Sequence, residues 1–368
     1  MNAPMRLSIT GRGAVTSAGC QLTEIREKLL SGWTPPLADL FPMPDGLQAV
    51  PYYYPLPDRC WEPPPDINTR DPFTAISSAA ASAALRDAGL EPNSTRLALV
   101  FGSIFGPATA THAYLERLCR RGPVGLSPSQ FLASIISMPA GWLSIYFGIR
   151  GSISVVSGVH PLEVARLWIA SGRENVVVLV ASETLSPAIL EAMIQFGERD
   201  PNDCVWPILS QGSIALVVEA EDHARARSAR IWASVLSMTS IPAAAPSKNP
   251  WSMSREMAEG NMREALSSAG QRNIDAVCSC ANGSSRIDSE EAAALKQLFA
   301  SPTPIIKPKV ALGELLGASG LASIFSASIL IQELHASGFN GNPRILVNDY
   351  EPLGQFSTVV VERGSAIP

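Results

Sequence analysis

The chain has 368 residues, of which 46% are hydrophobic and 17% are charged, and its formal net charge is −5. This composition excludes an intrinsically disordered chain and predicts a compact globular protein of one large or two ordinary domains. The slightly acidic balance also excludes a protein that binds nucleic acid through a general basic field.

Strand and helix patterns alternate along the first part of the chain. RLSITG predicts a strand and LTEIREKLLSG an amphipathic helix, whereas residues 33–69, rich in proline and aromatics, predict a long surface excursion with little regular structure. PFTAISSAAASAALRDAGL predicts a helix and TRLALVFGS a buried strand of the parallel type. SQFLASIISMPAGWLSIYFG predicts a buried helical stretch with a proline break.

The stretch SISVVSGVHPLEVARLWIASG predicts a sharp turn from a strand into a helix, which we call the elbow. Pro161 is the first residue of the expected helix and Gly172 follows its end, the positions where each is favoured. Many α/β enzymes hold a nucleophile at such a turn, but here the residue is Val159. The adjacent His160 is either a catalytic base or a cap for the helix N-terminus.

The second part of the chain, from SIALVVEAED onward, repeats the same plan. REMAEGNMREALSSAG and SEEAAALKQLFA predict helices, and IDAVCSCANG, RILVNDY and STVVVER predict strands. We therefore expect an α/β protein of two similar halves, residues 1–215 and 216–368.

No common cofactor or metal motif is complete. GRGAVTSAG has Thr16 where the dinucleotide-binding G-x-G-x-x-G needs glycine, so a glycine-rich turn between strand and helix is the favoured interpretation. Cys278 and Cys280 form a C-x-C rather than the C-x-x-C of zinc and redox sites, and the four histidines lack ligand spacing. The sequence predicts no metal, no cofactor and reduced thiols.

No segment is predicted to enter a membrane. The N-terminal MNAPMRLSIT lacks the basic and apolar regions of a signal peptide. The longest uncharged apolar run, residues 315–331, is interrupted by glycines and serines and falls short of the ~20 residues that span a bilayer. We expect a buried helix there and a cytoplasmic location.

Five stretches, in order along nearly the whole chain, resemble the β-ketoacyl synthases of the thiolase fold. LSITGRGAVTSAG is similar to the family's opening strand, GRENVVVLVASET to the strand after the elbow helix, and DSEEAAALKQLF to an acidic helix. IIKPKVALGELLGASGLAS resembles the family's K-x-x-x-G-H-x-x-G-A-x-G segment, and VNDYEPLGQFSTVVV stands where a glycine-rich loop is found. The resemblance implies a layered αβαβα architecture.

Residue by residue, the resemblance implies that the catalytic side chains of the family are missing. The elbow cysteine falls on Val159, and the two histidines fall on Asn282 and Glu314, while the lysine of the last motif matches Lys309. Glu351, Pro352 and Leu353 occupy the glycine-rich loop. Valine cannot attack a thioester, asparagine cannot shuttle protons, and a carboxylate at 314 repels a developing enolate.

Two arrangements of Glu314 remain open from the sequence. Glu314 follows Lys309 by five residues, so the two side chains can form an ion pair that neutralises both. Alternatively, Glu314 faces a solvated channel and pairs with nothing.

Family members that lose the cysteine resemble the chain-length factors, or ketosynthase β subunits, of type II polyketide systems. The resemblance implies a non-catalytic subunit that pairs with a cysteine-bearing ketosynthase α subunit by continuing its sheet across a two-fold axis, and that serves a chain held by an acyl carrier protein. An apolar tunnel ends elongation where the next unit clashes. The side chains that we expect to limit the tunnel are Phe105, Thr109, Thr111, Ile136, Met138 and Leu162.

Two other functions stay open at this stage. The first is an active acyltransferase of the same fold that uses relocated residues such as His160 or Cys280, although Cys280 is more simply a buried structural thiol. The second is a scaffold that only stabilises its partner. An oxidoreductase using GRGAVTSAG would need nicotinamide binding and is disfavoured.

Overall fold

The computed structural model describes residues 6–37, 53–57, 61–64, 71–93, 95–187, 189–190, 207–242, 253–270, 273–299, 303–339, 341–352 and 355–364. Most of the expected surface excursion at residues 33–69 lies outside these ranges. Within it, β2 (Tyr53–Tyr54) pairs in parallel with β6 (Leu209–Ser210), so this stretch contains a short strand that the sequence did not predict.

Ten strands form two sets of five with the same topology. The first set is β1 (Leu7–Val15), β3 (Ala98–Gly102), β4 (Ile153–Val156), β5 (Val176–Glu183) and β7 (Gly212–Ala220). The second set is β8 (Ala233–Pro242), β9 (Ala276–Cys278), β10 (Ile305–Ile306), β11 (Arg344–Glu351) and β12 (Gln355–Arg363). The sheet order is β10-β9-β11-β12-β8-β1-β7-β5-β3-β4, which places the strands of each set in the order third, second, fourth, fifth, first.

Strand direction repeats as well. In each set the second strand pairs in parallel with the third and fourth, and the fifth pairs antiparallel with the first and fourth. The sets join where β1 and β8 pair over a few residues. The boundary at residue 215 stays a prediction, and β7 runs through it.

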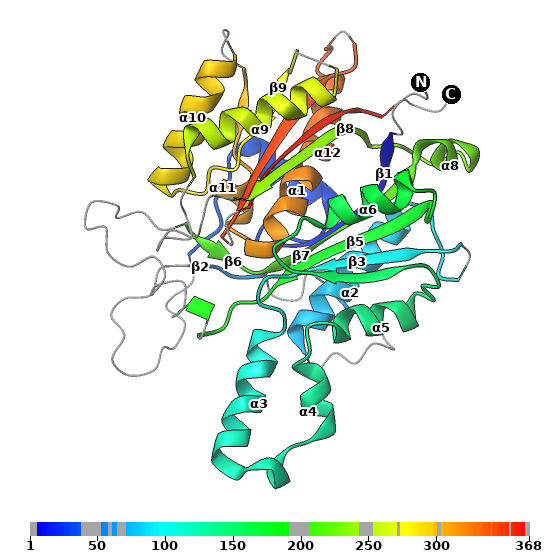
Figure 1. The fold of residues 1–368 in the computed structure, drawn as a ribbon, viewed down its shortest axis with the longest axis vertical. Helices are drawn as coiled ribbons and strands as arrows, with labels where there is room; N and C mark the ends of the chain where they lie inside the picture. The colour runs from blue at the N-terminus through cyan, green and yellow to red at the C-terminus, as the bar shows by residue number, and fades with distance from the viewer. Residues whose placement is uncertain are drawn as a thin grey trace.

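Helices cover both outer faces and fill the space between the two strand sets (Figure 1). The outer helices are α2 (Pro72–Asp87), α5 (Met138–Tyr146), α9 (Arg255–Ser268) and α10 (Ser285–Leu298). Those between the sets are α1 (Leu22–Ser31), α6 (Pro161–Ala170) and α12 (Ser319–Ala336). Three apolar cores separate these layers, one on each outer face and one in the middle, so the architecture is αβαβα.

The long apolar segment is part of the central core. Residues 316–336 are long and apolar enough to cross a membrane, but 89% of the apolar window is buried inside the protein. The buried helix predicted at residues 315–331 is therefore confirmed as α12.

The glycines of GRGAVTSAG have a packing role that differs from the expected turn. Gly11 and Gly13 lie inside β1, and a Cβ atom there would come within 2.2 Å of the Ala84 carbonyl oxygen and 2.1 Å of the Ala80 carbonyl oxygen on α2. The alanine-rich face of α2 and these glycines let helix and strand approach closely. The prediction of a turn is confirmed only for the second part of the motif, because the strand continues to Val15 and Thr16 then pairs with Gly19 across a turn that leads to α1.

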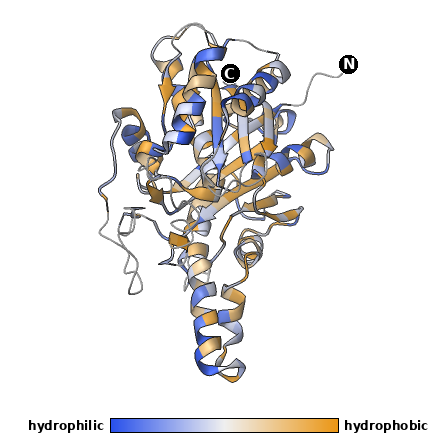
Figure 2. Ribbon diagram, turned by 60° about the vertical axis from the view of Figure 1, so that its left-hand side comes forward, coloured by the Kyte–Doolittle hydropathy of each residue, from blue (hydrophilic) through white to orange (hydrophobic). Residues whose placement is uncertain are grey.

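A two-helix projection extends from the first half. It consists of α3 (Ala108–Arg121), the short 3₁₀ turn η1 (Pro123–Gly125) and α4 (Pro128–Ala133), and we call residues 108–133 the arm (Figure 1). No residue of α3 or α4 is buried, and hydrophobic and hydrophilic residues both occur along the arm (Figure 2). The sequence did not predict α3. It predicted SQFLASIISMPAGWLSIYFG as one buried helical stretch, which is wrong for α4, because no residue of α4 is buried.

The remaining elements are α8 (Glu221–Ala226), α11 (Lys309–Leu312) and the 3₁₀ turn η2 (Leu316–Ala318). The turn η2 sits against β5 and β7 and leads directly into α12. The short helix α11 and η2 carry the motif IIKPKVALGELLGASGLAS to the middle of the molecule.

Candidate functional site

The elbow forms at the carboxyl end of β4. Gly158 has a φ of 68°, a conformation that favours glycine, and Val159 follows with 39% of its surface exposed. His160 then caps α6, because its Nδ1 accepts a hydrogen bond of 3.1 Å from the backbone N–H of Leu162. The elbow therefore has the shape that usually presents a nucleophile, with a valine in that place.

His160 is a structural cap rather than a base. Burial lowers its pKa to about 4, an effect that the nearby Gly320 backbone only partly offsets, so the imidazole is neutral at pH 7. The ring packs tightly on α12, since a Cβ atom at Gly320 would lie 2.5 Å from Nε2 of His160. The interpretation of His160 as a cap is confirmed.

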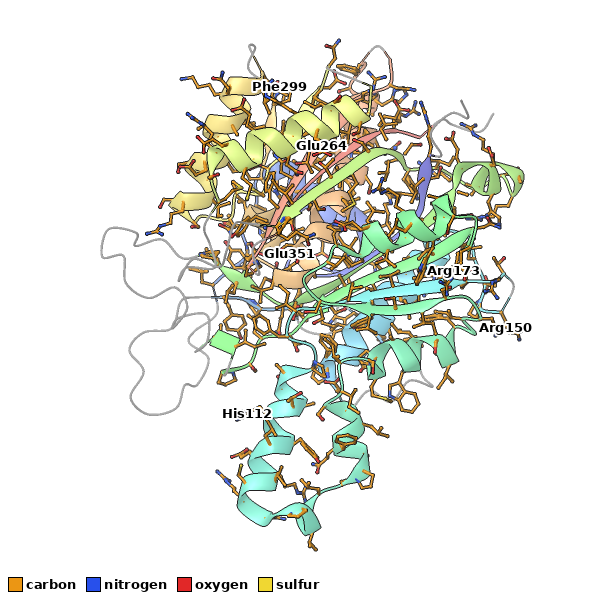
Figure 3. The ribbon with its side chains drawn as sticks, viewed as in Figure 1. His112, Arg150, Arg173, Glu264, Phe299 and Glu351 are labelled. Carbon is orange, nitrogen blue, oxygen red and sulfur yellow. The ribbon has the colours of Figure 1, made fainter. Side chains whose placement is uncertain are left out.

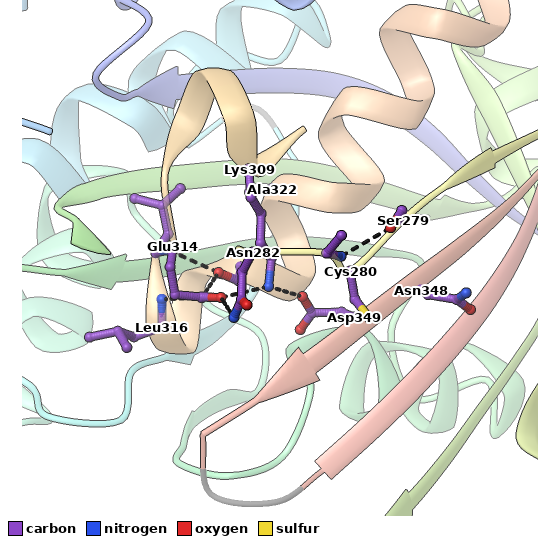
Figure 4. Close-up of polar contacts among 12 residues, drawn as sticks. Ser279, Cys280, Asn282, Lys309, Glu314, Leu316, Ala322, Asn348 and Asp349 are labelled. Carbon is purple, nitrogen blue, oxygen red and sulfur yellow. Dashed lines mark hydrogen bonds and ion pairs between the residues drawn. The ribbon is translucent and has the colours of Figure 1, made fainter. Parts of the chain in front are cut away.

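The second half brings Asn282, Lys309 and Glu314 together (Figure 4). Asn282 follows β9, Lys309 begins α11, and Glu314 comes after Gly313, whose φ of 73° turns the chain back. Glu314 Oε2 accepts hydrogen bonds from Asn282 Nδ2 at 3.0 Å and Lys309 Nζ at 2.8 Å.

The other carboxylate oxygen of Glu314 is satisfied too. Oε1 accepts a hydrogen bond of 2.9 Å from the backbone N–H of Leu316 and another from the Ser319 hydroxyl. Glu314 is 1% exposed. The ion pair with Lys309 is thus the arrangement that the protein adopts, and the alternative of a solvated, unpaired Glu314 is wrong.

Lys309 holds a second buried carboxylate. Its Nζ lies 3.2 Å from Asp349 Oδ1, near the end of β11. Burial alone would lower the pKa of Lys309, but the carboxylates of Glu314 and Asp349 outweigh it and raise that pKa. Burial raises the pKa of Asp349 to about 6, although Lys309 opposes the shift. Lys309 is therefore a buried cation shared by two acids.

Two more acids border this centre. Glu183, at the end of β5, accepts hydrogen bonds from Ser103 Oγ at 3.0 Å and from the backbone N–H groups of Ile104 and Phe105. Glu351 Oε2 is buried and has no hydrogen-bond partner among the described residues (Figure 3). Burial raises the pKa of each to about 8, and the neighbouring Asp349 adds to the shift of Glu351. At pH 7 both side chains are therefore mainly neutral acids.

These pKa shifts predict a loss of stability with rising pH. A carboxyl group whose pKa is higher in the folded chain favours folding fully below its unfolded pKa of about 4.3, and that contribution is lost as pH rises through the folded value. Between about pH 4 and pH 9, urea denaturation should show Glu351→Gln gaining about 2–4 kcal/mol relative to the unmodified chain. Glu264→Gln on the exposed face of α9 (Figure 3) is the control. If the free energy of unfolding changed with pH in the same way for the unmodified chain, Glu351→Gln and Glu264→Gln, the prediction would be contradicted.

The described residues offer no thiol–imidazole pair in place of the missing one. Cys280 is fully buried, and burial together with the nearby Glu291 raises its pKa well above the ordinary thiol value. Burial likewise raises the pKa of Cys278. No cluster of histidine, cysteine and acidic side chains suited to a metal ion is found in the described ranges.

The two stretches predicted to flank a tunnel meet at the base of the arm. A Cβ atom at Gly106 would contact Ile136, and Thr111 Oγ1 donates a hydrogen bond of 3.1 Å to the Ser134 carbonyl. Thr109 and Met138 line a pocket of about 420 Å³ between the arm and the body.

The other tunnel candidates do not line this pocket. Phe105 is half-buried and packs against the outer core of the second half. Leu162 is 1% exposed and belongs to the central core.

Sequence reasoning missed Glu183 and Asp349. Glu183 is the last residue of the buried strand VVVLVASE, and Asp349 lies near the end of the buried strand RILVNDYE. An acidic residue at the end of a buried strand was the available signal. Tyr114 and Trp142, which line the pocket with Thr109 and Met138, gave no signal, because aromatic residues on helices are mostly ordinary core.

Sequence comparisons match both halves of the chain to one family. A profile of the β-ketoacyl synthase N-terminal domain matches residues 58–198, and one of the β-ketoacyl synthase C-terminal domain matches residues 234–336. The chain is 30% identical to 3-oxoacyl-[acyl-carrier-protein] synthase 2 of Rhizobium meliloti (strain 1021), covering 88% of this chain and 85% of that protein. The chain belongs to the β-ketoacyl synthase family.

Relatives within the β-ketoacyl synthase family include a subunit of a polyketide synthase. The tetracenomycin polyketide synthase ketoacyl synthase beta subunit of Streptomyces glaucescens is 27% identical over 72% of this chain and 69% of its own length. This chain is therefore similar both to a 3-oxoacyl synthase and to a ketosynthase beta subunit.

The fold of this β-ketoacyl synthase family member matches solved structures. The ishigamide ketosynthase/chain length factor aligns with a TM-score of 0.78 at 20% identity, covering 99% of this chain and 100% of that one. The thiolase-like fold predicted from the sequence is confirmed. Within it, the elbow and the Lys309 centre are neighbours, because His160 and Asp349 border the same residue, Gly320.

Proposed function

We propose that this chain is a non-catalytic subunit of the chain-length-factor type, which pairs with a cysteine-bearing ketosynthase and shapes the tunnel for the growing chain. The observation that carries the proposal is Val159 at the elbow together with Glu314 locked by Lys309 and Asn282. Formation of an acyl-enzyme thioester needs a thiol nucleophile, which valine lacks. A buried carboxylate in the place of a proton-donating imidazole repels the negative charge of a developing enolate. The growing chain would arrive on an acyl carrier protein in the cytoplasm.

An exposed sheet edge supports the pairing. β4 ends its side of the sheet, and Ile153 on it is 46% exposed. Ile145 on α5, which packs against β4, is 73% exposed, and Leu167 on α6, which packs against β3 and β5, is 62% exposed. An open edge with apolar side chains is a template for another strand, and stable proteins normally cover it. A partner with the same fold can continue the sheet there.

The arm adds apolar surface on the same half. Leu115 and Phe131 are about half exposed, and Val124 at the tip is 98% exposed. A short two-helix projection without buried residues has little stability of its own. Contact with a partner along the arm and β4 would bury both, and obligate interfaces of this kind typically cover roughly 2,000 Å² or more.

Co-expression with a cysteine-bearing ketosynthase should give a 1:1 complex that size-exclusion chromatography and native mass spectrometry detect. Ile153→Lys should weaken the complex at least tenfold, because a charge replaces an apolar contact at the sheet edge. Ile305→Lys is the matched control, since Ile305 is 49% exposed on β10, the strand at the opposite edge. A stable, monodisperse monomer in the presence of the ketosynthase, or equal weakening by both variants, would contradict the pairing.

Product analysis of that complex separates the two roles of the subunit. A subunit that shapes the tunnel alters product length when tunnel side chains change. A scaffold that only stabilises its partner alters yield and leaves product length constant.

A further inference from the structure

Three arginines gather where the parallel strands of the first half begin. The neighbouring strands β4, β3 and β5 run parallel, so their amino ends lie side by side at one end of the sheet. Arg96 comes shortly before β3, Arg150 before β4 and Arg173 before β5. Figure 3 shows Arg150 and Arg173 at this end of the sheet, away from Glu351 in the middle of the molecule. We call the three residues the arginine cluster.

One buried carboxylate anchors the arginine cluster. Glu174 accepts two hydrogen bonds of 3.2 Å from Arg96, and its Oε1 accepts two of 2.8 Å from the N–H and the hydroxyl of Ser152. Arg173 Nε donates a hydrogen bond of 2.7 Å to the same hydroxyl. Arg96 Nη1 donates one of 3.1 Å to the Arg150 carbonyl. These bonds fix the backbone that enters β4.

The arginine cluster carries more positive charge than its anchor balances. Burial would raise the pKa of Glu174, but hydrogen bonds from Ser152 and Arg96 outweigh burial and lower that pKa, so the group is a carboxylate at pH 7. Glu174 is 3% exposed, whereas the side chain of Arg96 is 64% exposed. Arg150 and Arg173 are exposed too, and neither forms an ion pair with a described residue. On a chain of net charge −5, this is a local basic surface.

The arginine cluster borders the apolar edge of the sheet. Ser152 is followed directly by Ile153, an exposed residue of β4. The Arg173 guanidinium lies 5.7 Å from the ring centroid of Trp168 on α6, and Leu167 beside that tryptophan is 62% exposed. Protein interfaces combine an apolar centre with a polar rim. The cluster therefore has the place of a charged rim at one end of the β4 edge.

A partner that continues the sheet at β4 brings one particular segment to the arginine cluster. When its edge strand runs antiparallel to β4, the carboxyl end of that strand lies opposite residues 150–152. In a second copy of this chain that end is Ser-Gly-Val at residues 157–159, which carries no charge. The first acid after it, Glu163, already accepts a hydrogen bond of 3.4 Å from Gln355 Nε2. A second copy is therefore a poor electrostatic match.

We propose that the arginine cluster binds an acidic segment of the ketosynthase, placed where the edge strand of the ketosynthase ends, and thereby favours this partner over a second copy of the chain. The inference rests on the proposed function and deepens it by naming the chemistry of the partner's contact. Guanidinium groups bind carboxylates through paired hydrogen bonds. Complementary charges also speed encounter and suppress mismatched partners.

The test is a competition for a limiting amount of ketosynthase. The ketosynthase is co-expressed with the unmodified chain and a variant, which carry tags of different mass, and native mass spectrometry measures the share of each in the 1:1 complex. The double variant Arg150→Glu with Arg173→Glu should be depleted about tenfold or more, because it reverses both charges. Arg150→Gln with Arg173→Gln removes the charges without reversing them and should be depleted about threefold.

Arg263→Glu is the matched control for the competition. Arg263 lies on α9, which covers the outer face of the second half, and its side chain is 57% exposed and pairs with Glu259. This variant should enter the complex as well as the unmodified chain does. Thermal denaturation of each chain checks folding, and the glutamine variant provides the comparison if the charge reversal impairs folding. Equal depletion of the Arg263 variant and the double variants would overturn the inference.

Salt dependence tests the same contact in the purified complex. From about 0.1 M to about 1 M NaCl the Debye length falls from about 10 to about 3 Å. The dissociation constant should therefore rise about threefold more for the unmodified complex than for the glutamine variant. The spectra of the competition also count homodimers, and an unmodified homodimer as abundant as the 1:1 complex would contradict the stated preference.

Failure of this inference differs from failure of the proposed function. If the unmodified chain forms the 1:1 complex and the arginine variants compete equally with it, this inference fails and the proposed function stands. If the unmodified chain forms no complex with a cysteine-bearing ketosynthase, the proposed function fails and this inference fails with it.

Discussion

Incubated with an acylated acyl carrier protein, the purified chain should keep its unmodified intact mass. Val159 stands where a nucleophile would attack, and a valine side chain forms no thioester. Cys278 and Cys280 are fully buried thiols whose pKa values burial raises, so they do not replace it. A stoichiometric acyl adduct in intact-mass spectra would sink the proposal of a non-catalytic subunit.

The variant Val159→Cys tests whether the elbow retains its shape. A cysteine at the N-terminus of α6 should have a lowered thiol pKa, so iodoacetamide should add one more label than to the unmodified chain, in which Cys119 is already exposed. The variant should still condense acyl chains about 10²–10⁴-fold more slowly than a complete ketosynthase, because Asn282 and Glu314 supply no imidazole. Full condensation activity would show that relocated residues do the chemistry.

The second large effect is the loss of the buried cation. Lys309→Met should destabilise the fold by about 3–5 kcal/mol, because it leaves Glu314 and Asp349 buried without their shared cation. Chemical denaturation measures this change. The loss should be smaller near pH 5 than near pH 8, since burial already raises the pKa of Asp349 to about 6 and its protonated form needs no cation.

Lys307→Met is the matched control for that experiment. Lys307 lies two residues earlier, its side chain is 51% exposed, and its Nζ is 4.0 Å from Asp288 Oδ2. An exposed pair at that distance contributes about 0–1 kcal/mol. The double variant Lys309→Met with Glu314→Gln should recover part of the stability, because it removes one of the two stranded charges. Equal effects of Lys309→Met and Lys307→Met would refute the role of Lys309.

The local pattern of the sequence accounts for much of the fold. Fully apolar runs such as VVVLVASE are buried strands because no polar face remains for solvent. Pro161 at the first position of α6 and the Gly158 turn before it mark the elbow through backbone preferences that neighbouring residues decide. For the site, the sequence predicted two features only. One is a valine at the nucleophile position of the elbow, and the other is a lysine followed five residues later by a glutamate.

Long-range contacts account for what the sequence reading missed. Asp349 joins Lys309 from a strand forty residues further along the chain, and Glu183 reaches the base of the arm from β5. The glycines of β1 proved to be packing positions only once α2 was seen against them. A periodic pattern reports which residues are buried but carries no information on which distant segment covers them.

The sequence by itself determined that this is an α/β protein built twice on one plan, with an elbow that lacks a nucleophile, because periodicity, turn residues and residue identity are local properties. Only the tertiary structure decided that Glu314 is paired rather than solvated, that its cation is shared with Asp349, and that an arm projects over an apolar pocket. Ionisation and cavity shape depend on burial and on side chains brought together from distant segments, and chain folding alone creates both.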